Sequence, residues 1–338
     1  MSVDRWLVDL FSKTCAVCHQ LTSEFNYGVH SCNACKMFIR RQAVRKTPFK
    51  PCIQQESCYQ AAPLNFGCQL CRFQKSIEVG MNIQPLLQKT SIQELLHDIS
   101  AHHMNRVFLL LNSYPENSNL KIEQMLREET SFVARQKYHE MNWDSWYYIT
   151  LVSTVYFMKQ FPFVYFARLQ DRIAIIRETF LKVALFSASF RAYALGKEVI
   201  SFPDGSSIFP SKETERIVKD LNMPELITGR LISKMRELQI ANEEFLLVLV
   251  ILFCNPAITN LSDTGRRLLS TYQNFYSSSL FKICSMNNSG HVRFMELLSL
   301  TNLAETAVKD VNQYFVLLQL SSPAFKVCEI LREGLSLL

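Results

Sequence analysis

The chain has 338 residues, of which 48% are apolar and 20% are charged, and its formal net charge is +6. This length allows about two domains. The longest apolar run, residues 245–254, has ten residues, which is too short to span a bilayer and typical of a buried helix. The first eleven residues contain Asp4 and Asp9 and no basic leader. We therefore expect no signal peptide and no membrane partner.

Eight cysteines in the first 71 residues form two closely spaced sets. The first set is Cys15-x2-Cys18-x13-Cys32-x2-Cys35, and the second is Cys52-x5-Cys58-x9-Cys68-x2-Cys71. Four thiolates complete a tetrahedral Zn–S4 cage with bonds of about 2.3 Å. The spacing therefore predicts two closed, structural Zn2+ sites that have no open position for catalysis.

The alternative is a disulfide framework. Disulfide-dense chains are usually small secreted domains that cannot build a core, whereas 338 residues with 48% apolar content need no such cross-links. Cys254, Cys284 and Cys328 stand alone in apolar surroundings and are interpreted as core residues. Zinc is the favoured interpretation of the first eight cysteines, and reduced thiols imply the cytosol or the nucleus.

Positive charge is concentrated around the cysteines. Residues 12–89 contain ten Lys or Arg and three Glu, a balance of +7. The densest cluster is Arg40, Arg41, Arg45 and Lys46, close to Lys36. A solvated charged surface is the alternative, but a basic cluster directly after a metal-binding knuckle indicates a polyanionic partner.

A helix is predicted over residues 32–46, ended by Thr47-Pro48 because proline disfavours helical geometry in the residue before it. Its exposed stripe contains Asn33, Lys36, Met37, Arg40, Arg41 and Val44, and the rest of its surface contains Phe38, Ile39, Gln42 and Ala43. A rigid helix with a polar, basic stripe suits the major groove of double-stranded DNA. A second helix is predicted over residues 69–79, ended by Gly80, with Arg72 and Lys75 outside to contact phosphates.

Three motifs resemble the DNA-binding domain of nuclear hormone receptors: residues 27–32 (YGVHSC), 32–41 (CNACKMFIRR) and 71–81 (CRFQKSIEVGM). The CNACK form is similar to that of divergent receptors abundant in nematodes. The resemblance implies a small zinc-stabilised α domain, residues 12–81, with two four-cysteine sites and two helices. It implies half-site discrimination by Asn33, Ala34 and Met37, base-edge contacts by Lys36 and Arg41, and phosphate contacts by Tyr27, Arg40, Arg72 and Lys75. It also implies dimerisation on DNA through residues 53–57.

Residues 82–91 are interpreted as a hinge and residues 92–338 as a second domain. Helical periodicity covers residues 143–158, 173–193, 213–220, 224–238, 243–254, 263–284 and 292–320. Asp204-Gly205, between β-forming residues in the segment 199–209, predicts a hairpin. The apolar helix near residues 243–254 must be wrapped by others. We therefore expect an all-α three-layer helical sandwich of roughly ten helices with one small β-hairpin.

Residues 159–176 resemble, more weakly, a receptor ligand-binding domain, because a Pro and an Asp follow Lys159 at the family's spacing. The resemblance implies that Arg191 contacts a ligand carboxylate or hydroxyl; the alternative is pairing with a backbone carbonyl or a local acid. It implies that Lys159 and Glu329 clamp a coactivator helix; the alternative is two solvated charges. Glu329 lies in a last helix expected to open at Ser322-Pro323.

Two main functions remain open. The first is a nuclear, zinc-dependent, sequence-specific transcription factor of nuclear-receptor type, regulated by a small lipophilic ligand and bound by coregulator proteins. The second is a ligand-independent DNA-bound protein whose helical domain dimerises, as a homo- or heterodimer. The resemblance implies a dimer interface at residues 294–320, and a central buried helix is the other interpretation of that segment. A zinc-stabilised protein-interaction module is a third possibility. An enzyme is least expected, because both metal sites are closed.

Overall fold

The structure is a computed structural model, and it describes residues 13–59, 67–136, 141–209, 222–223, 225–286, 290–323 and 325–335. The chain divides into two compact units. Unit 1 contains Met1–Ser91, Gln160–Arg172 and Pro256–Phe275, and unit 2 contains Ile92–Lys159, Ile173–Asn255 and Tyr276–Leu338. Helices α9 (Leu169–Ala194) and α13 (Asp263–Cys284) each contribute to both units. The boundaries 12–81, 82–91 and 92–338 stay a prediction.

Two short hairpins begin unit 1. Strand β1 (Lys13–Thr14) pairs antiparallel with β2 (Leu21–Thr22), and β3 (Phe25–Asn26) pairs with β4 (Val29–His30). The β3–β4 turn has positive φ at both central residues, 52° at Tyr27 and 90° at Gly28, which is typical of a type I′ turn. Strands of two residues are too short to show alternation in sequence, so they were not predicted.

Helix α2 (Asn33–Gln42) begins where it was predicted but ends earlier than the expected Lys46. Arg45 explains the early end, because its side chain folds onto the chain that follows. Its Nε donates to the Thr47 carbonyl at 2.8 Å, and its Nη2 donates to the Pro48 carbonyl at 3.3 Å. These two bonds stabilise a turn after α2 in place of a further helical turn.

Helix α3 (Gln69–Glu78) ends as predicted at a glycine. Gly80 has a φ of 97°. The Gly80 N–H donates to the Ile77 carbonyl and the Met81 N–H donates to the Ser76 carbonyl, both at 3.0 Å. This is a Schellman cap, which satisfies carbonyls at the helix end and favours glycine. The predicted hinge follows, and within it α4 (Gln84–Leu87) buries Leu86 and Leu87.

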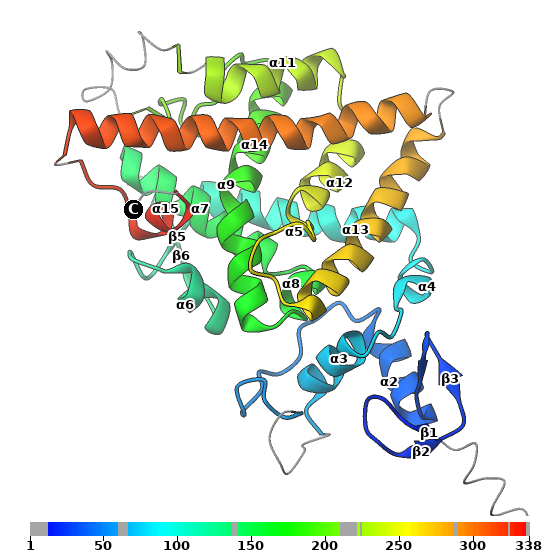
Figure 1. The fold of residues 1–338 in the computed structure, drawn as a ribbon. Coiled ribbons are helices and arrows are strands. Elements are labelled where there is room, and N and C mark those ends of the chain that lie inside the picture. Colours follow the sequence, from blue (N-terminus) through cyan, green and yellow to red (C-terminus); the bar gives the residue numbers. More distant parts are fainter. Residues whose placement is uncertain are drawn as a thin grey trace, which may run out of the picture. The chain divides into compact units, whose positions relative to one another are not determined.

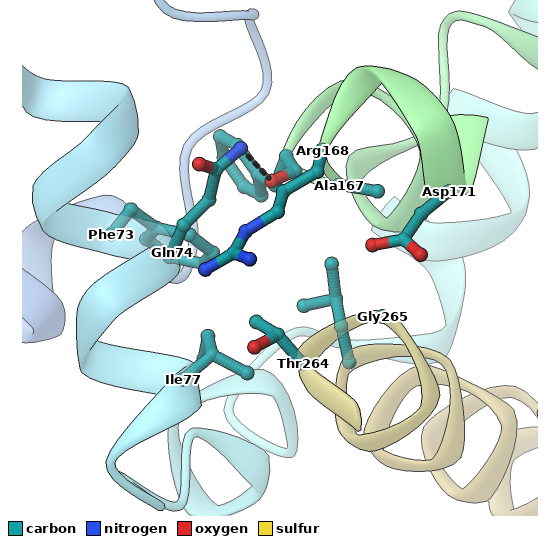
Figure 2. A pocket seen from close by; sticks show the side chains of 10 residues that line it. Phe73, Gln74, Ile77, Ala167, Arg168, Asp171, Thr264 and Gly265 are labelled. Atoms are coloured by element: carbon teal, nitrogen blue, oxygen red, sulfur yellow. Dashed lines mark hydrogen bonds between the residues drawn. The ribbon is translucent and has the colours of Figure 1, made fainter. Parts of the chain in front are cut away.

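The inner face of α3 packs within unit 1. The Phe73 and Phe166 rings lie 4.3 Å apart, and Gln74 Nε2 donates to the Phe166 carbonyl at 3.3 Å (Figure 2). Phe166 follows the short helix α8 (Pro162–Tyr165). Phe73 is fully buried, and Gln74 is 4% exposed. Apolar burial therefore fixes the side of α3 that faces away from solvent.

Ion pairs surround this packed face in unit 1. Arg172 Nη2 lies 3.0 Å from Glu56 Oε1, and Arg168 Nη2 lies 2.8 Å from Glu78 Oε2. The Glu56–Arg172 pair is the more enclosed, with side chains 16% and 19% exposed. Asp171 is buried and accepts hydrogen bonds from the backbone N–H and the hydroxyl of Ser262, both at 2.7 Å.

Unit 2 is built from helices around α12 (Figure 1). Its elements are α5 (Ile92–Asn112), α6 (Ile122–Arg127), α7 (Trp143–Met158), the π-helix η1 (Glu225–Gly229), α11 (Arg230–Glu237), α12 (Asn242–Phe253), α14 (Gly290–Ser321), α15 (Glu329–Gly334) and its parts of α9 and α13. Every residue of α12 after Glu243 is buried. Helix α12 contacts α5 and α14, and α5 packs on α7. The all-α, three-layer prediction is confirmed.

Two small β features accompany these helices. Residues Ser201 and Ser207 form an antiparallel bridge around Gly205, whose φ is 90°, at the predicted hairpin. A further hairpin, β5 (Ser113–Pro115) with β6 (Phe132–Ala134), was not predicted. The helix expected at residues 213–220 lies outside the described residues.

The predicted start of the last helix is wrong. Helix α15 begins at Glu329, and residues 325–328 are not helical. Phe325 packs against Trp143, with ring centroids 5.4 Å apart, and Val327 is 6% exposed. The Phe325–Trp143 contact and the burial of Val327 keep the segment non-helical, and this tertiary packing overrides the local helix-start signal at Ser322.

Candidate metal centres and nucleic-acid interface

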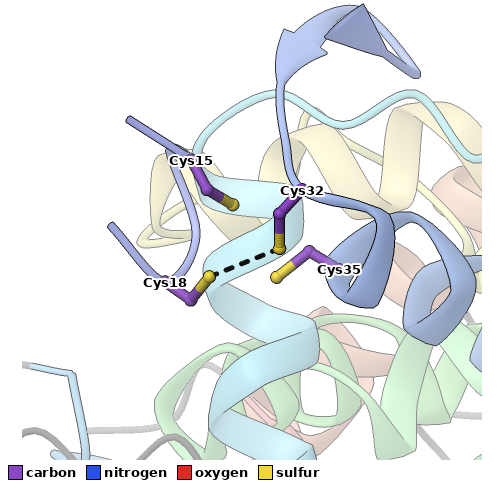
Figure 3. A group of neighbouring side chains, drawn as sticks. All are labelled: Cys15, Cys18, Cys32 and Cys35. Carbon is purple, nitrogen blue, oxygen red and sulfur yellow. Dashed lines mark hydrogen bonds between the residues drawn. The ribbon is translucent and has the colours of Figure 1, made fainter. Parts of the chain in front are cut away.

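The first cysteine set converges from separate segments of unit 1. Cys15 and Cys18 lie between β1 and β2, Cys32 is the N-cap of α2, and Cys35 lies in its first turn (Figure 3). All four sulfur atoms lie within 4.8 Å of one another, and those of Cys18 and Cys32 are 3.6 Å apart. Tetrahedral Zn–S bonds of about 2.3 Å place sulfurs about 3.8 Å apart. The sulfurs therefore surround a volume that fits one zinc ion.

The second set has the same arrangement at the start of α3. Cys68 is the N-cap of α3 and Cys71 lies in its first turn. The Cys52 sulfur lies 3.4 Å from that of Cys58 and 3.5 Å from that of Cys71. All four sulfur atoms again lie within 4.8 Å of one another. Each site has four sulfur donors, so both sites fit structural zinc ions with closed coordination.

The electrostatics of the first site differ from one thiol to the next. Burial raises the pKa of the Cys15 thiol, but backbone N–H groups of Cys32, Cys18 and Val17 outweigh burial and lower it to about 7. Burial raises the pKa of Cys35 well above its ordinary value, against the opposing hydrogen bond from Arg72. That guanidinium donates from Nη2 to the Cys35 sulfur at 3.3 Å. A cation beside the cage offsets the net negative charge of a Zn–S4 centre.

The exposed face of α2 coincides with the predicted stripe. The exposed residues are Asn33, Ala34, Met37, Arg40 and Arg41, with Val44 just beyond the helix end and Lys36 partly exposed. The opposite face buries Phe38 and Ile39. One helix therefore combines an apolar inner face, a metal-anchored start and a basic outer face, and such a helix suits the major groove.

Two family models match this chain. The model for a double treble clef zinc finger of C4 type matches residues 13–83, and the model for the ligand-binding domain of nuclear hormone receptor matches residues 129–321. The chain belongs to the nuclear hormone receptor family. Its two domains make it a transcription factor of nuclear-receptor type, with two structural zinc ions.

Three relatives come from Caenorhabditis elegans. Nuclear hormone receptor family member nhr-167 is 38% identical over 330 residues, covering 95% of this chain and 96% of the relative. Member nhr-27 is 32% identical and covers 93% of this chain and 89% of its own length, and member nhr-9 is 30% identical and covers 95% and 96%. The likeness therefore extends over both domains and confirms a divergent nematode-type receptor.

Three further residues predicted to contact DNA differ in how strongly their side chains are held by other groups of the receptor. Lys36 Nζ lies 3.9 Å from Glu24, and Lys75 Nζ lies 2.9 Å from Glu78. The Arg72 guanidinium lies over the Phe38 ring at 4.5 Å and bonds Cys35, so it is directed toward the metal site. The prediction that Arg72 stays outside did not anticipate this position.

Three predicted residues belong to the helical part of the receptor. Arg191 Nη2 donates to the Ser201 carbonyl at 2.6 Å. Lys159 Nζ donates to the Met125 carbonyl at 2.9 Å. Glu329 lies 3.0 Å from Arg332 and 3.9 Å from Lys121. The ligand-contact and clamp roles of these residues stay predictions.

One residue that the sequence interpretation missed is Arg106. It lies on the buried side of α5 with Ile99 and Leu110 and is 4% exposed. A signal was present, because the spacing of these residues places an arginine inside an apolar helical stripe.

None of the described helices of the receptor has the length and apolarity of a membrane span.

Proposed function

We propose that this receptor acts in the nucleus by binding specific DNA sequences through the exposed face of α2. The observation that carries the proposal is the exposure of the stripe, complete except for the partly exposed Lys36, on a helix that starts at two zinc ligands, Cys32 and Cys35. Zinc fixes the position of the helix start, and burial of Phe38 and Ile39 fixes its rotation. Both are needed, because base readout requires side chains held on a rigid element.

Within this proposal the stripe divides into two roles. Asn33, Ala34 and Met37 discriminate between half-sites, and Lys36 and Arg41 contact base edges. Arg40 and Tyr27 hold phosphates, which position the helix but carry no sequence information. Lys75 also contacts a phosphate, which replaces Glu78 as the ion-pair partner of its amine. Arg72 acts from within, by tying α3 to the Cys35 site and the Phe38 ring.

The test is selection of binding sites from random DNA with the full chain. We expect one consensus half-site for the wild type and an altered consensus for the double variant Asn33→Gly, Met37→Ala. Arg40→Ala is the matched control, because it should weaken binding to all sequences and leave the consensus unchanged. Selection that returns no consensus, or one that the double variant leaves intact, would contradict the proposal.

The helical domain has three proposed partners: a small ligand, a coregulator protein and a second receptor chain. A small lipophilic ligand contacts Arg191, and coregulator helices bind between Lys159 and Glu329, with dimerisation through α14. A cation and a carboxylate at opposite ends of an apolar surface complement the charges at the ends of a bound helix. In the free chain Lys159 donates to backbone carbonyls and Glu329 pairs with Arg332, so a bound helix exchanges these contacts.

Charge reversal tests the clamp. We expect Lys159→Glu to weaken binding of an amphipathic coregulator peptide, measured by fluorescence anisotropy, and Glu329→Lys to do the same. Lys326→Glu is the control, since it lies near the last helix but outside the proposed clamp. If the control variant lost as much peptide affinity as the clamp variants, the effect would come from net charge and not from the clamp. Unchanged binding in both clamp variants would favour a ligand-independent dimerisation role for the domain.

A further inference from the structure

Helix α6 is a short amphipathic helix that lies against α7. The first, fourth and fifth of its six residues are apolar. Ile122 is 0% exposed and Met125 is 1% exposed, whereas Glu123 and Arg127, which form an ion pair, are half-exposed. Anchors at i, i+3 and i+4 are those by which an amphipathic helix binds in an apolar groove of a partner. Helix α6 therefore binds the rest of the domain as a separate helical peptide would.

A lysine holds the C-terminal end of α6. Lys159, the C-cap residue of α7, donates from Nζ to the Met125 carbonyl at 2.9 Å and to the Glu128 carbonyl at 3.3 Å. Met125 lies in the last turn of α6, and Glu128 is its C-cap. The last carbonyls of a helix have no partner within the helix. The ammonium group therefore satisfies carbonyls that α6 leaves open.

A glutamate holds the opposite end of α6. The Ile122 backbone N–H donates to Glu333 Oε2, on α15, at 3.2 Å. Lys121, the N-cap residue, lies 3.9 Å from the carboxylate of Glu329, one turn earlier on α15. The Glu333 side chain is 13% exposed and lies 3.7 Å from Arg177 on α9. Of the two acids, Glu333 therefore holds the helix backbone, and Glu329 contacts a side chain.

Packed elements of the domain fix the positions of both polar groups. Lys159 directly follows α7, most of which is buried. On α15, Ile330 and Leu331 are fully buried. At Gly334 the chain approaches α9 so closely that a Cβ there would overlap the Phe180 ring. The lysine and the glutamate are therefore permanent parts of the surface that α6 covers.

The chain on both sides of α6 allows the helix to leave this surface. Helix α6 lies in the connection 116–131, whose two ends are joined by the β5–β6 hairpin (Figure 1). Within the connection, residues 116–121 and 128–131 form neither helix nor strand. Such segments absorb the changes in φ and ψ that a hinge motion requires. Release of α6 therefore does not require the hairpin to open.

We propose that α6 is an internal competitor for coregulator helices: it occupies their binding surface in the free receptor and leaves when a partner helix binds. The inference rests on the proposed coregulator binding, because Lys159 serves in both, and it adds Glu333 as the acid that holds the helix backbone. Each of these two groups already bonds the backbone of α6, so the surface accepts one helix at a time. The docked fraction of α6 therefore lowers the apparent affinity for a partner.

A peptide copy of α6 tests the competition. The probe is a fluorescein-labelled peptide with the sequence of residues 118–129 and the change Met125→Leu, which conserves volume and distinguishes the peptide from the receptor by mass. Fluorescence anisotropy follows its titration with the full zinc-loaded chain. The receptor variant Ile122→Ala, Met125→Ala loosens α6. It should bind the peptide about 10- to 100-fold more tightly than the wild type, the factor expected if α6 is docked about 90–99% of the time.

Two further variants separate competition from a general change in the domain. Glu123→Ala is the matched control, because it changes the half-exposed side of the same helix, and it should keep the wild-type affinity. Glu333→Gln, added to the loosened receptor, should reduce the gain in affinity, because the carboxylate then binds the peptide backbone.

Hydrogen exchange follows the displacement of α6 in the wild-type receptor. The Met125 N–H donates to the Lys121 carbonyl at 3.0 Å, and the Glu128 N–H donates to the Gln124 carbonyl at 2.9 Å. Excess peptide should speed exchange at these two amides, measured by mass spectrometry. Equal peptide affinity in the wild type and the loosened receptor, or unchanged exchange in α6 when peptide is bound, would overturn the inference and leave coregulator binding intact. Absence of peptide binding to every variant would overturn both proposals.

Discussion

The zinc-binding part of unit 1 and the helical core of unit 2 hold their charges in opposite ways. In the first, eight thiols gather into two sets whose negative charge zinc compensates, with Arg72 beside one set. In the second, Arg106 is buried and donates to a neutral group, the Thr154 hydroxyl. One region balances its charge with two metal ions, whereas the other keeps a buried cation beside a neutral acceptor.

The two regions also derive their stability from different sources. Unit 2 has α12, whose apolar side chains are buried on all sides, and stacked rings such as Phe245 and Phe190, 3.7 Å apart. The zinc part has short hairpins and two helices of ten residues each. Small domains of this kind depend on metal binding for folding. The comparison predicts that zinc loss damages the first region and core truncation the second.

Zinc removal should have the largest effect. We expect Cys32→Ser to reduce bound zinc from two ions to one and to abolish specific DNA binding, because α2 loses the anchor of its first turn. Cys284→Ser is the matched control: this cysteine is buried and lies outside both sets. Metal analysis by mass spectrometry and gel shift provide the measurements. Specific binding by a one-zinc protein would contradict the dependence of α2 on the metal.

Truncation of a side chain in the core of unit 2 should have the next largest effect. Phe245 is fully buried and stacks with Phe186 and Phe190, so Phe245→Ala should reduce the free energy of unfolding by about 3–5 kcal/mol. Phe108→Ala is the same substitution at a residue that is 59% exposed, and it should change stability by less than about 0.5 kcal/mol. Denaturation followed by circular dichroism measures both. Zinc content should stay at two ions in each variant.

Sequence patterns predicted those parts of the structure that depend on residues close together in the chain. Cysteine spacing predicted both metal sites, and periodicity predicted the bounds of α7 and α13 as the structure has them. The basic stripe of α2 was predicted because helical spacing alone determines which residues share a face.

Contacts between distant residues account for what the sequence did not reveal. The Phe325–Trp143 contact and the burial of Val327 delay the start of α15, and a side chain folding back, Arg45, ends α2 early. Arg106 and Thr154 are 48 positions apart in the sequence, and no local pattern indicates that they meet. The zinc ligands were predictable because cysteine chemistry fixes their grouping. The partner of Arg106 was not, because tertiary packing brings the two side chains together.

His103, which is partly buried, should make the helical core sensitive to acid. Burial, together with the charge of Arg106, lowers the pKa of His103 to about 3, against about 6.5 in the unfolded chain. As pH falls, His103 therefore takes up a proton in the unfolded state before it does so in the folded state. The contribution of neutral His103 to the free energy of unfolding is fully present above pH 6.5 and decreases as pH falls toward 3. At pH 5.5 the loss is about 1.4 kcal/mol. In His103→Gln this loss should disappear.

The measurement is the free energy of unfolding at pH 7.5 and pH 5.5, with zinc content checked at both. His97→Gln is the control, because the His97 side chain is 83% exposed. Its variant should lose as much stability as the wild type between the two pH values. An unchanged loss in His103→Gln would place the acid sensitivity elsewhere, in the cysteine sites first.

Lys36 tests whether the outer face of α2 carries sequence information as well as charge. Its side chain is 39% exposed and lies 3.9 Å from Glu24, so it is held loosely and is free to reach a base. Lys36→Ala should cost about 1–3 kcal/mol of discrimination at one base pair, measured as the ratio of Kd values for the selected site and its single-base variants. Arg40→Ala, one turn further on the same exposed face, should instead weaken every site equally and reduce the salt slope by about 1. If both variants weakened all sites alike, the stripe would act as a phosphate-binding surface, and discrimination would rest with Asn33 and Met37.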